Sequence, residues 1–313
     1  MKLAELVSHY VASQHALGMR YRTQAVTLKA FCHAMGDCHI NDVQADDVQA
    51  FIAGQGPVTA FWHHKYRVLE GFYRFAITRG FTHVSPLPTM GPTCPPALPP
   101  YSYSVEELRR LLAATDGLQT ARSPLQACTF RTLLLLLYGT GMRIGEALAL
   151  TLADVNLQDC LLTVRDAKFY KTRWVPTGPQ LTAKLAAYAT QRRRLPLPVG
   201  ADSAFLATRT GHHLSYVRAS QLFRRVRQDA DIHREPGARY QPRLHDLRHT
   251  AAVHRLIAWY RDGRDVQRLL PHLSTYLGHV GIASTQRYLT MTPEVLAEAS
   301  HRFEHYAHMG DLT

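Results

Sequence analysis

The sequence predicts a mainly α-helical protein with two domains, the first all-helical and the second α+β with a small antiparallel sheet. Three observations predict this class. Apolar residues recur at helical spacing along most of the chain, strand-like alternation is confined to short stretches of its second half, and one proline-rich segment interrupts it. At 313 residues the chain is long enough for two ordinary domains.

Residues 1–90 are expected to form the all-helical domain. Four segments repeat apolar residues at helical spacing between short polar or glycine-containing breaks: VSHYVASQHAL (7–17), AVTLKAFCHAM (25–35), ADDVQAFIAG (45–54) and FWHHKYRVLEGFYRFAITRG (61–80). The last helix mixes aromatic and basic residues, among them Trp62, Lys65 and Arg67. Its basic side could lie along a DNA backbone, whereas its aromatic side chains are expected in the core.

A domain boundary is predicted in PLPTMGPTCPPALPP, residues 86–100, of which seven are proline. Proline lacks an amide donor and fixes its own φ, so this composition favours an extended, semi-stiff connector over a helix or strand. We therefore assign residues 91–100 to a linker and residues 101–313 to the second domain.

The second domain is predicted to begin with a helix in SVEELRRLLAA, because Ser104 and Glu107 have the spacing of a capping box. A long apolar helix should follow and end near the turn Gly139-Thr140-Gly141. DCLLTVRDAKFYKTRWVP (159–176) alternates like two strands joined by a tight loop, and AFLAT (204–208) is expected to add a third strand. Helices then continue from SYVRASQLFRRVRQDA to the C-terminus.

The charge balance favours a polyanionic partner. The net charge is +12, the pI is about 9.7, and arginine outnumbers lysine. Each phosphate that a basic side chain neutralises releases counterions and strengthens binding, and guanidinium groups fit phosphate with paired hydrogen bonds. DNA is therefore the expected partner, and a merely soluble basic protein is the alternative.

Composition also indicates the compartment. The longest apolar run, Leu133 to Tyr138, is far shorter than the roughly 18 residues that a bilayer span needs, and the N-terminus has the pattern of an amphipathic helix rather than of a signal peptide. We expect a cytoplasmic protein, associated with the bacterial nucleoid when on DNA, whose five cysteines are reduced. No metal is expected, because Cys32-His33 and Cys38-His39 have the spacing of no common zinc finger.

Four short stretches of the second domain carry candidate functional residues: GTGMRIGEAL with Arg143 and Glu146, DAKFYKTR with Lys168 and Lys171, RLHDLRHTAAVHRL with His245, Arg248 and His249, and HVGIASTQRYLT with His279, Arg287 and Tyr288. Each alone is a weak signal. The first pair could be a surface ion pair of little energetic value, and a lysine at a loop tip is ordinarily solvated. The histidine pair resembles a zinc-protease helix, but Asp246 stands where that motif has a glutamate.

Taken in order, these stretches resemble the tyrosine recombinase family, the phage-integrase-like site-specific recombinases. That family's pattern is an arginine, a lysine, a histidine-x-x-arginine helix, and a histidine or tryptophan about nine residues before a tyrosine. The matching residues are Arg143, Lys168, His245, Arg248, His279 and Tyr288. Counting back from Val175-Pro176 selects Lys168, whereas a shifted register selects Lys171. Residues 259–279 are longer than the compact form of that region.

The resemblance implies an enzyme that cleaves and rejoins DNA through a 3′-phosphotyrosyl intermediate without metal, ATP or another cofactor. In such a site Tyr288 is the nucleophile, and a phenol needs a nearby base and a cationic setting to react at neutral pH. Arg143 and Arg248 would hold the phosphate oxygens, and His279 would donate a further hydrogen bond. His245 would accept the phenol proton, and Lys168 would protonate the leaving 5′-hydroxyl.

The resemblance also implies the partners. The helical domain, matching the family's core-binding module, and the catalytic domain would clamp double-stranded DNA at specific recombination sites. Recombination, such as integration of a mobile genetic element, would require a homotetramer on two DNA sites, assembled from a monomer or weak oligomer, with an accessory DNA-bending protein as a further candidate partner. A C-terminal helix with Thr292 as N-cap and Pro293 at its first turn is expected to dock Val295, Leu296 and Phe303 on a neighbouring protomer.

Two alternative functions compete with this one. A type IB topoisomerase uses a similar tyrosine and basic residues but relaxes supercoils as a monomer, and the compact first domain and C-terminal helix favour recombination over it. A non-catalytic DNA-binding regulator has no use for the complete set of six residues, which argues against that class.

Overall fold

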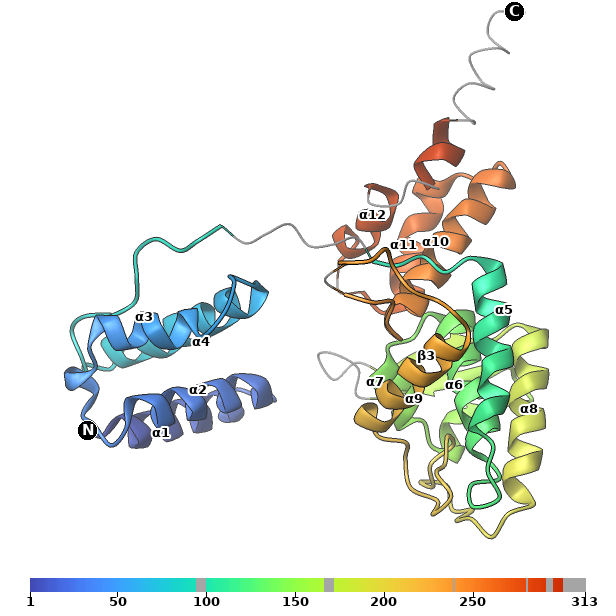
Figure 1. Cartoon of the computed structure of the whole chain (residues 1–313), viewed down its shortest axis with the longest axis horizontal. Coiled ribbons are helices and arrows are strands. Elements are labelled where there is room, and N and C mark those ends of the chain that lie inside the picture. The colour runs from blue at the N-terminus through green and yellow to red at the C-terminus, as the bar shows by residue number, and fades with distance from the viewer. Residues whose placement is uncertain (94–99, 166–171, 239, 280, 291–294, 301–313) are drawn as a thin grey trace, which may run out of the picture. The chain divides into compact units, whose positions relative to one another are not determined.

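The computed structural model describes residues 1–93, 100–165, 172–238, 240–279, 281–290 and 295–300. The chain divides into two compact units, Met1–Ala97 and Leu98–Thr313, and the division falls within the segment 91–100 assigned to the linker. Helices dominate both units, and the second adds a small antiparallel sheet (Figure 1). The predicted mainly α class is confirmed. No described helix is both long enough and apolar enough to cross a membrane.

The first unit is helical over its described length. Its elements are α1 (Leu3–Ala16), α2 (Arg22–Met35), the short 3-10 turn η1 (Ile40–Asp42), α3 (Ala45–Ala53) and α4 (Ala60–Thr78). Helices α2 and α3 end where Gly36 and Gly54 take φ values of 74° and 60°, a conformation that glycine adopts at little cost.

Helix α4 separates its aromatic and basic residues as the sequence predicts. It begins at Thr59, whose hydroxyl accepts the Phe61 backbone N–H at 3.1 Å. Trp62 and Phe72 are buried in the core of the first unit, where α1 and α2 pack against α4, and Arg67 and Arg74 are exposed. Trp62 and Phe72 of α4 therefore help to build the core, whereas Phe61 is exposed, and Arg67 and Arg74 remain available on the surface.

The second unit is built around one long buried helix. Its helices are α5 (Val105–Ala114), η2 (Thr115–Leu118), α6 (Gln126–Thr140), α7 (Ile144–Ala149), η3 (Leu152–Asp154), α8 (Pro179–Arg193), α9 (Tyr216–Asp229), α10 (Asp246–Arg261), α11 (Val266–Leu277) and α12 (Ala283–Thr290). The apolar helix α6 packs against α8 and α10 and ends at Gly141, as predicted. The capping box of α5 is confirmed, with Ser104 N–Glu107 Oε2 at 2.8 Å and Glu107 N–Ser104 Oγ at 3.1 Å.

The sheet has the order β1 (Val155–Asn156), β2 (Leu161–Val164), β3 (Arg173–Pro176), and both pairs are antiparallel. The predicted pair of strands is confirmed, with Val164 opposite Arg173. The prediction of a strand in AFLAT is wrong, because Ala204 and Ala207 take part only in isolated bridges to Thr151 and His213. Burial rather than strand pairing explains the apolar run of residues 204–207. The segment 166–171, with Lys168 and Lys171, lies outside the described residues.

The last helices of the second unit form a separate apolar cluster. The long stretch 259–279 contains the end of α10, a turn at Gly263 (φ 67°) and α11. Val295 is 1% exposed and packs with residues of α10 and α11, such as Val253 and Leu256, whereas Leu296 is 52% exposed. Val295 was expected on a neighbouring protomer, but an apolar face of its own chain covers it. Thr292, Pro293 and Phe303 lie outside the described residues.

Candidate active site

Arg143 stands where two helices meet. Helix α6 ends at Gly141 in a left-handed conformation (φ 63°), and Arg143 is the N-cap of α7. The Glu146 carboxylate, one turn into α7, accepts the Arg143 backbone N–H at 2.8 Å and Nη1 at 2.7 Å. Arg143 Nη2 donates to the Gly278 carbonyl at 2.7 Å. These bonds tie the start of α7 to the turn that precedes His279.

Arg248 reaches the same turn from α10. It is 3% exposed, and its Nη1 and Nη2 donate to the carbonyls of Gly141 at 2.7 Å and Leu277 at 2.8 Å. These carbonyls lie at the C-terminal ends of α6 and α11, where the helix dipole favours a cation. Burial, and then the positive charge of Arg143, lowers the pKa of Arg248 to about 10, so the guanidinium is protonated at neutral pH.

Glu146 does not form the surface ion pair considered from the sequence. Its side chain is 8% exposed, and Arg173 of β3 binds both carboxylate oxygens, with Nη2–Oε2 at 2.7 Å and Nη1–Oε1 at 3.0 Å. Burial by itself raises the pKa of Glu146, but the hydrogen bonds and charges of Arg173 and Arg143 outweigh it and lower the pKa to about 2. The carboxylate is thus ionised throughout the physiological range.

His279 follows the Gly278 turn and is half-buried. Its backbone N–H donates to the Ser274 carbonyl at 3.0 Å, and its Nδ1 lies 2.7 Å from the Thr285 hydroxyl. Burial lowers the pKa of His279 to about 4, assisted by the positive charges of Arg248, Arg143 and Arg173. The imidazole is therefore neutral at neutral pH.

Tyr288 lies on α12 and is half-buried between two histidines. Its ring centroid is 4.9 Å from that of His249 and 6.0 Å from that of His279. His249 is 5% exposed. The tyrosine is therefore held beside the residue that stands nine positions before it, as the sequence pattern predicts.

His245 immediately precedes α10 and is exposed, although Arg248 and His249, expected on the same helix face, are buried. Partial desolvation, and then the positive charge of Arg248, lowers the pKa of His245. Arg143 contributes in the same direction, and His245 in turn lowers the pKa of His279. These mutual influences place His245 within electrostatic reach of the other groups.

Contacts around the turn before His279 bring together four of the six residues selected from the sequence, Arg143, Arg248, His279 and Tyr288, and His245 precedes the helix that carries Arg248. The sixth, Lys168, lies outside the described residues. Two guanidinium groups, a neutral imidazole donor, a phenol and a second imidazole form one site. Such a set can bind an anionic tetrahedral group and transfer it to an oxygen nucleophile.

Comparison with known proteins agrees with this geometry. Residues 103–294 match the pattern of the family described as "Phage integrase family". The chain belongs to that family. The putative integrase/recombinase y4rB of Sinorhizobium fredii is 32% identical over 308 residues, 96% of each chain. The tyrosine recombinase XerD of Mycobacterium leprae is 34% identical over 235 residues, 74% of this chain and 69% of XerD. The predicted resemblance is confirmed, and this chain is a tyrosine-type site-specific recombinase.

The fold of the recombinase agrees with a solved structure of lower sequence similarity. The crystal structure of a lambda integrase tetramer bound to a Holliday junction superposes with a TM-score of 0.66 at 17% identity. The match covers 92% of this chain and 77% of the lambda integrase chain. Because the identity is low, this likeness supports the architecture rather than any residue's role.

Three further residues lie in the candidate site of the recombinase: the sequence did not indicate Arg173 or Thr285, and it indicated His249 without a role. Arg173 follows the predicted hairpin tip, for which the sequence indicated only Lys168 and Lys171. No local pattern indicates that Arg173 pairs with Glu146. Thr285 could have been found, because it lies three residues before Tyr288 and so on the same helix face. His249 was noticed on the face of Arg248 but was given no role.

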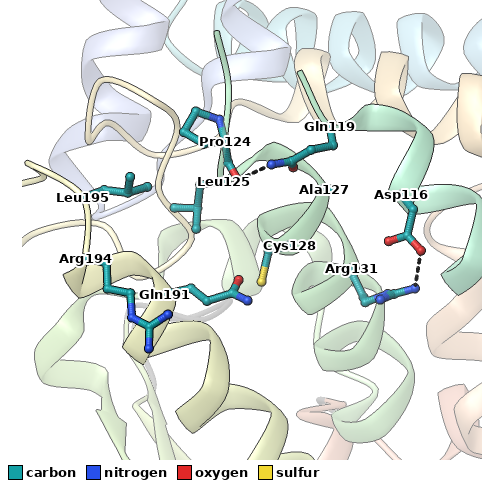
Figure 2. A pocket seen from close by; sticks show the side chains of 10 residues that line it. All are labelled: Asp116, Gln119, Pro124, Leu125, Ala127, Cys128, Arg131, Gln191, Arg194 and Leu195. Atoms are coloured by element: carbon teal, nitrogen blue, oxygen red, sulfur yellow. Dashed lines mark hydrogen bonds and ion pairs between the residues drawn. The ribbon is translucent and has the colours of Figure 1, made fainter. Parts of the chain in front are cut away.

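A separate hollow of the recombinase is lined by residues of α6, α8 and the segments around them (Figure 2). Arg131 and Asp116 form an ion pair there (Nη2–Oδ2 3.4 Å), and the Gln119 amide donates to the Pro124 carbonyl at 2.7 Å. None of the residues that line it belongs to the set selected from the sequence. The hollow is therefore separate from the candidate active site.

Proposed function

We propose that the recombinase cuts a DNA strand by attack of the Tyr288 hydroxyl on a phosphodiester. The bond from the Tyr288 oxygen to phosphorus forms while the bond from phosphorus to the 5′ oxygen breaks. This leaves a 3′-phosphotyrosyl link and a free 5′-hydroxyl. The link conserves the energy of the broken bond, so attack by another 5′-hydroxyl rejoins the strand without ATP. One observation carries the proposal. The ring of Tyr288 contacts the ring of His279, and His279 directly follows the turn whose backbone carbonyls bind Arg143 and Arg248.

Arg143 and Arg248 are the proposed clamp on the phosphate. A guanidinium has five N–H donors, so bonds from Arg248 to two carbonyls leave donors for the non-bridging oxygens. Both groups are preorganised by protein contacts and partly shielded from water, which strengthens their attraction for the charge of the transition state. Together they supply the positive charge that the reaction requires.

His279 is the proposed third donor to the phosphate. A neutral imidazole has one N–H, and its position depends on the hydrogen bond at the other nitrogen. If the Thr285 hydroxyl donates to Nδ1, the proton stands on Nε2 and is free for a phosphate oxygen. The low pKa of about 4 keeps this arrangement at neutral pH.

Two further groups are proposed to move protons. His245 accepts the Tyr288 phenol proton, and its lowered pKa keeps it in the neutral form that a base requires. Lys168, on the segment between β2 and β3, protonates the leaving 5′ oxygen, and Lys171 is the alternative in a shifted register. With these transfers each proton that is released has an acceptor and each leaving oxygen has a donor.

The proposed partner is double-stranded DNA at specific recombination sites, bound by a homotetramer on two sites that assembles from a monomer or weak oligomer. The net charge of +12 supports DNA binding by the chain, and the exposed Arg67 and Arg74 of α4 support a contribution of the first unit. An accessory DNA-bending protein is a further proposed partner. Because DNA is the substrate, we place the recombinase in the cytoplasm, at the nucleoid when bound.

A nicked suicide duplex tests the proposal. A nick beside the scissile phosphate lets the short 5′-hydroxyl fragment diffuse away, so the covalent protein–DNA adduct accumulates. Wild-type protein should form this adduct on DNA from the native element ends, and Tyr288→Phe should bind the same DNA without forming it. Adduct formation by Tyr288→Phe at the wild-type rate would exclude Tyr288 as the nucleophile.

The same preparation separates the alternatives. A non-catalytic DNA-binding regulator would trap no adduct with either protein. A type IB topoisomerase would relax a supercoiled plasmid that lacks any recombination site, whereas the proposed recombinase should require the site.

A further inference from the structure

Arg173 enters the site from strand β3. Its guanidinium binds both oxygens of Glu146 at 2.7 and 3.0 Å, and the two side chains are only 15% and 8% exposed. A bidentate pair of this kind fixes the relative orientation of the two groups as well as their distance. Arg173 is therefore a fixed part of the site rather than a solvated hairpin residue.

Glu146 is shared between Arg173 and Arg143. The same carboxylate accepts Nη1 and the backbone N–H of Arg143. With Arg173 on both oxygens, the negative charge of Glu146 is divided between two cations, so Arg143 retains a net attraction for an anion. Without Arg173, Glu146 would pair with Arg143 alone and oppose its binding to phosphate.

Arg173 also supports the turn before His279. Gly278 has a left-handed φ of 69°, and a Cβ at that position would lie 2.8 Å from Arg173 Cζ and Nη1, so the guanidinium packs directly against the glycine. Arg143 Nη2 binds the carbonyl of the same glycine. The two arginines therefore hold this turn from two sides.

The Nε group of Arg173 is buried, and it has no hydrogen-bond partner among the residues that the structure describes. A buried donor left unpaired is unfavourable, so the position of Arg173 is not explained by its own hydrogen bonding. In this position Arg173 contacts both Glu146 and Gly278.

We infer that Arg173 is a positioning residue for DNA cleavage: it holds Glu146 so that Arg143 is aimed at the scissile phosphate without being neutralised, and it fixes the Gly278–His279 turn. The inference rests on the proposed role of Arg143 in binding that phosphate. Arg173 acts through Arg143 and His279 rather than by touching DNA. Its loss should therefore lower the rate of the cleavage step more than the affinity for DNA.

The first experiment compares Arg173→Gln and Arg173→Lys with wild type in single-turnover cleavage of the nicked suicide duplex. At saturating protein, Arg173→Gln should cleave roughly 10- to 100-fold more slowly, the effect of a displaced catalytic group. Arg173→Lys should be intermediate, because one ammonium group does not hold both carboxylate oxygens. The Kd for the uncleaved duplex should change by less than about threefold, because no phosphate contact is removed.

A double variant tests the charge argument. Glu146→Gln combined with Arg173→Gln removes the negative charge that Arg173 no longer balances. The double variant should cleave faster than Arg173→Gln alone, because nothing then neutralises Arg143. If the losses of cleavage rate caused by Glu146→Gln and Arg173→Gln simply combined in the double variant, the result would contradict the inference.

A modified substrate gives a readout that a merely structural role would not move. A methylphosphonate at the scissile position removes one negative charge, so cleavage depends less on the positive charge of Arg143. The defect of Arg173→Gln relative to wild type should shrink on this substrate. An unchanged ratio would mean that Arg173 does not act through charge at the phosphate.

Arg165→Gln is the matched control. Arg165 follows β2 of the same hairpin, and its Nε pairs with the buried carboxylate of Asp154, whereas Arg173 pairs with Glu146. This variant should lose some thermal stability and keep its cleavage rate within about twofold, as expected of an exposed arginine. An equal loss of cleavage in Arg165→Gln and Arg173→Gln would overturn the inference.

The outcomes distinguish this inference from the proposed function. If wild type forms the adduct and Tyr288→Phe does not, the function holds. If Arg173→Gln or Arg173→Lys, folded by circular dichroism, then cleaves at the wild-type rate, the inference alone fails. If Tyr288→Phe forms the adduct, the proposed function itself is wrong.

Discussion

Two halves of the active site are held by different kinds of contact. The arginine cluster, Arg143, Glu146, Arg173 and Arg248, is joined by charge-assisted hydrogen bonds of 2.7 to 3.0 Å to its own members and to helix-end carbonyls. In the tyrosine cluster, His249, His279, Thr285 and Tyr288, the contacts between described residues include two ring contacts and one side-chain hydrogen bond.

This difference matches two tasks of a cleavage site, which are to stabilise the charge of the phosphate and to align the attacking oxygen. Short, directional bonds determine where positive charge stands before substrate arrives, which is what stabilisation of a developing charge requires. Ring contacts are weaker and less directional, so they hold the phenol near the site while allowing it to turn toward phosphorus. Tyr288, the proposed nucleophile, is thus expected to take its final alignment on DNA, whereas the proposed phosphate clamp is already formed.

The largest effect is expected where the arginine cluster is broken. In Arg248→Lys a single ammonium group replaces the fork that spans the Gly141 and Leu277 carbonyls and that is proposed to bind the phosphate. Single-turnover cleavage should fall by at least about 10²- to 10³-fold, the loss for one preorganised donor, and Tm should fall as well. Arg255→Lys, exposed on the same helix, is the control and should behave like wild type. Cleavage by Arg248→Lys within tenfold of wild type would mean that the cluster is not the clamp.

A smaller effect on the cleavage rate is expected from acid, and it acts through His245, which precedes the helix of Arg248 in the arginine cluster. Partial desolvation and the positive charge of Arg248 lower the pKa of His245, so the acid limb of the cleavage rate should lie below pH 6.5. Below the lowered pKa the base is protonated, and the rate should fall about tenfold per pH unit. An acid limb centred at or above pH 6.5 in the rate profile would exclude His245 as the base.

The free energy of unfolding should also decrease as the pH falls. The pKa of His279 is about 4 in the folded chain and 6.5 when unperturbed, so the unfolded chain takes up the proton first as the pH falls. The stability due to neutral His279 is therefore complete above pH 6.5 and lost progressively toward pH 4. Glu146, with a pKa of about 2 against 4.5, adds its loss only below pH 4.5. Urea midpoints between pH 4.5 and 7 should fall less steeply in His279→Asn than in wild type.

The smallest effect is expected within the tyrosine cluster. Thr285→Val keeps the shape of a fully buried side chain but removes the hydroxyl that lies 2.7 Å from His279 Nδ1. Loss of one such hydrogen bond should slow cleavage by about two- to tenfold, and Thr285→Ser should retain most of the rate. A slower reaction with Thr285→Ser than with Thr285→Val would show that packing, not the hydroxyl, matters.

The sequence predictions that are confirmed depend on local rules. The cap at Ser104, the end of α6 at Gly141 and the hairpin pair β2–β3 each depend on residues close together in the chain. The two failures concern burial. AFLAT is apolar because it is enclosed, not because it pairs as a strand, and Val295 was expected on another protomer although its own chain supplies an apolar face.

The sequence by itself determined the helical class, the basic character and the order of the six site residues, because periodicity, charge and spacing can be counted along a chain. Only the tertiary structure decided which charges meet. Arg173 pairs with Glu146 across 27 positions, and Arg143 binds Gly278 across 135. Burial at those meeting points sets the strength of each pair and the pKa of each group. Neither distance nor burial can be counted along the chain, because both arise when α6, α10, α11 and the hairpin pack together.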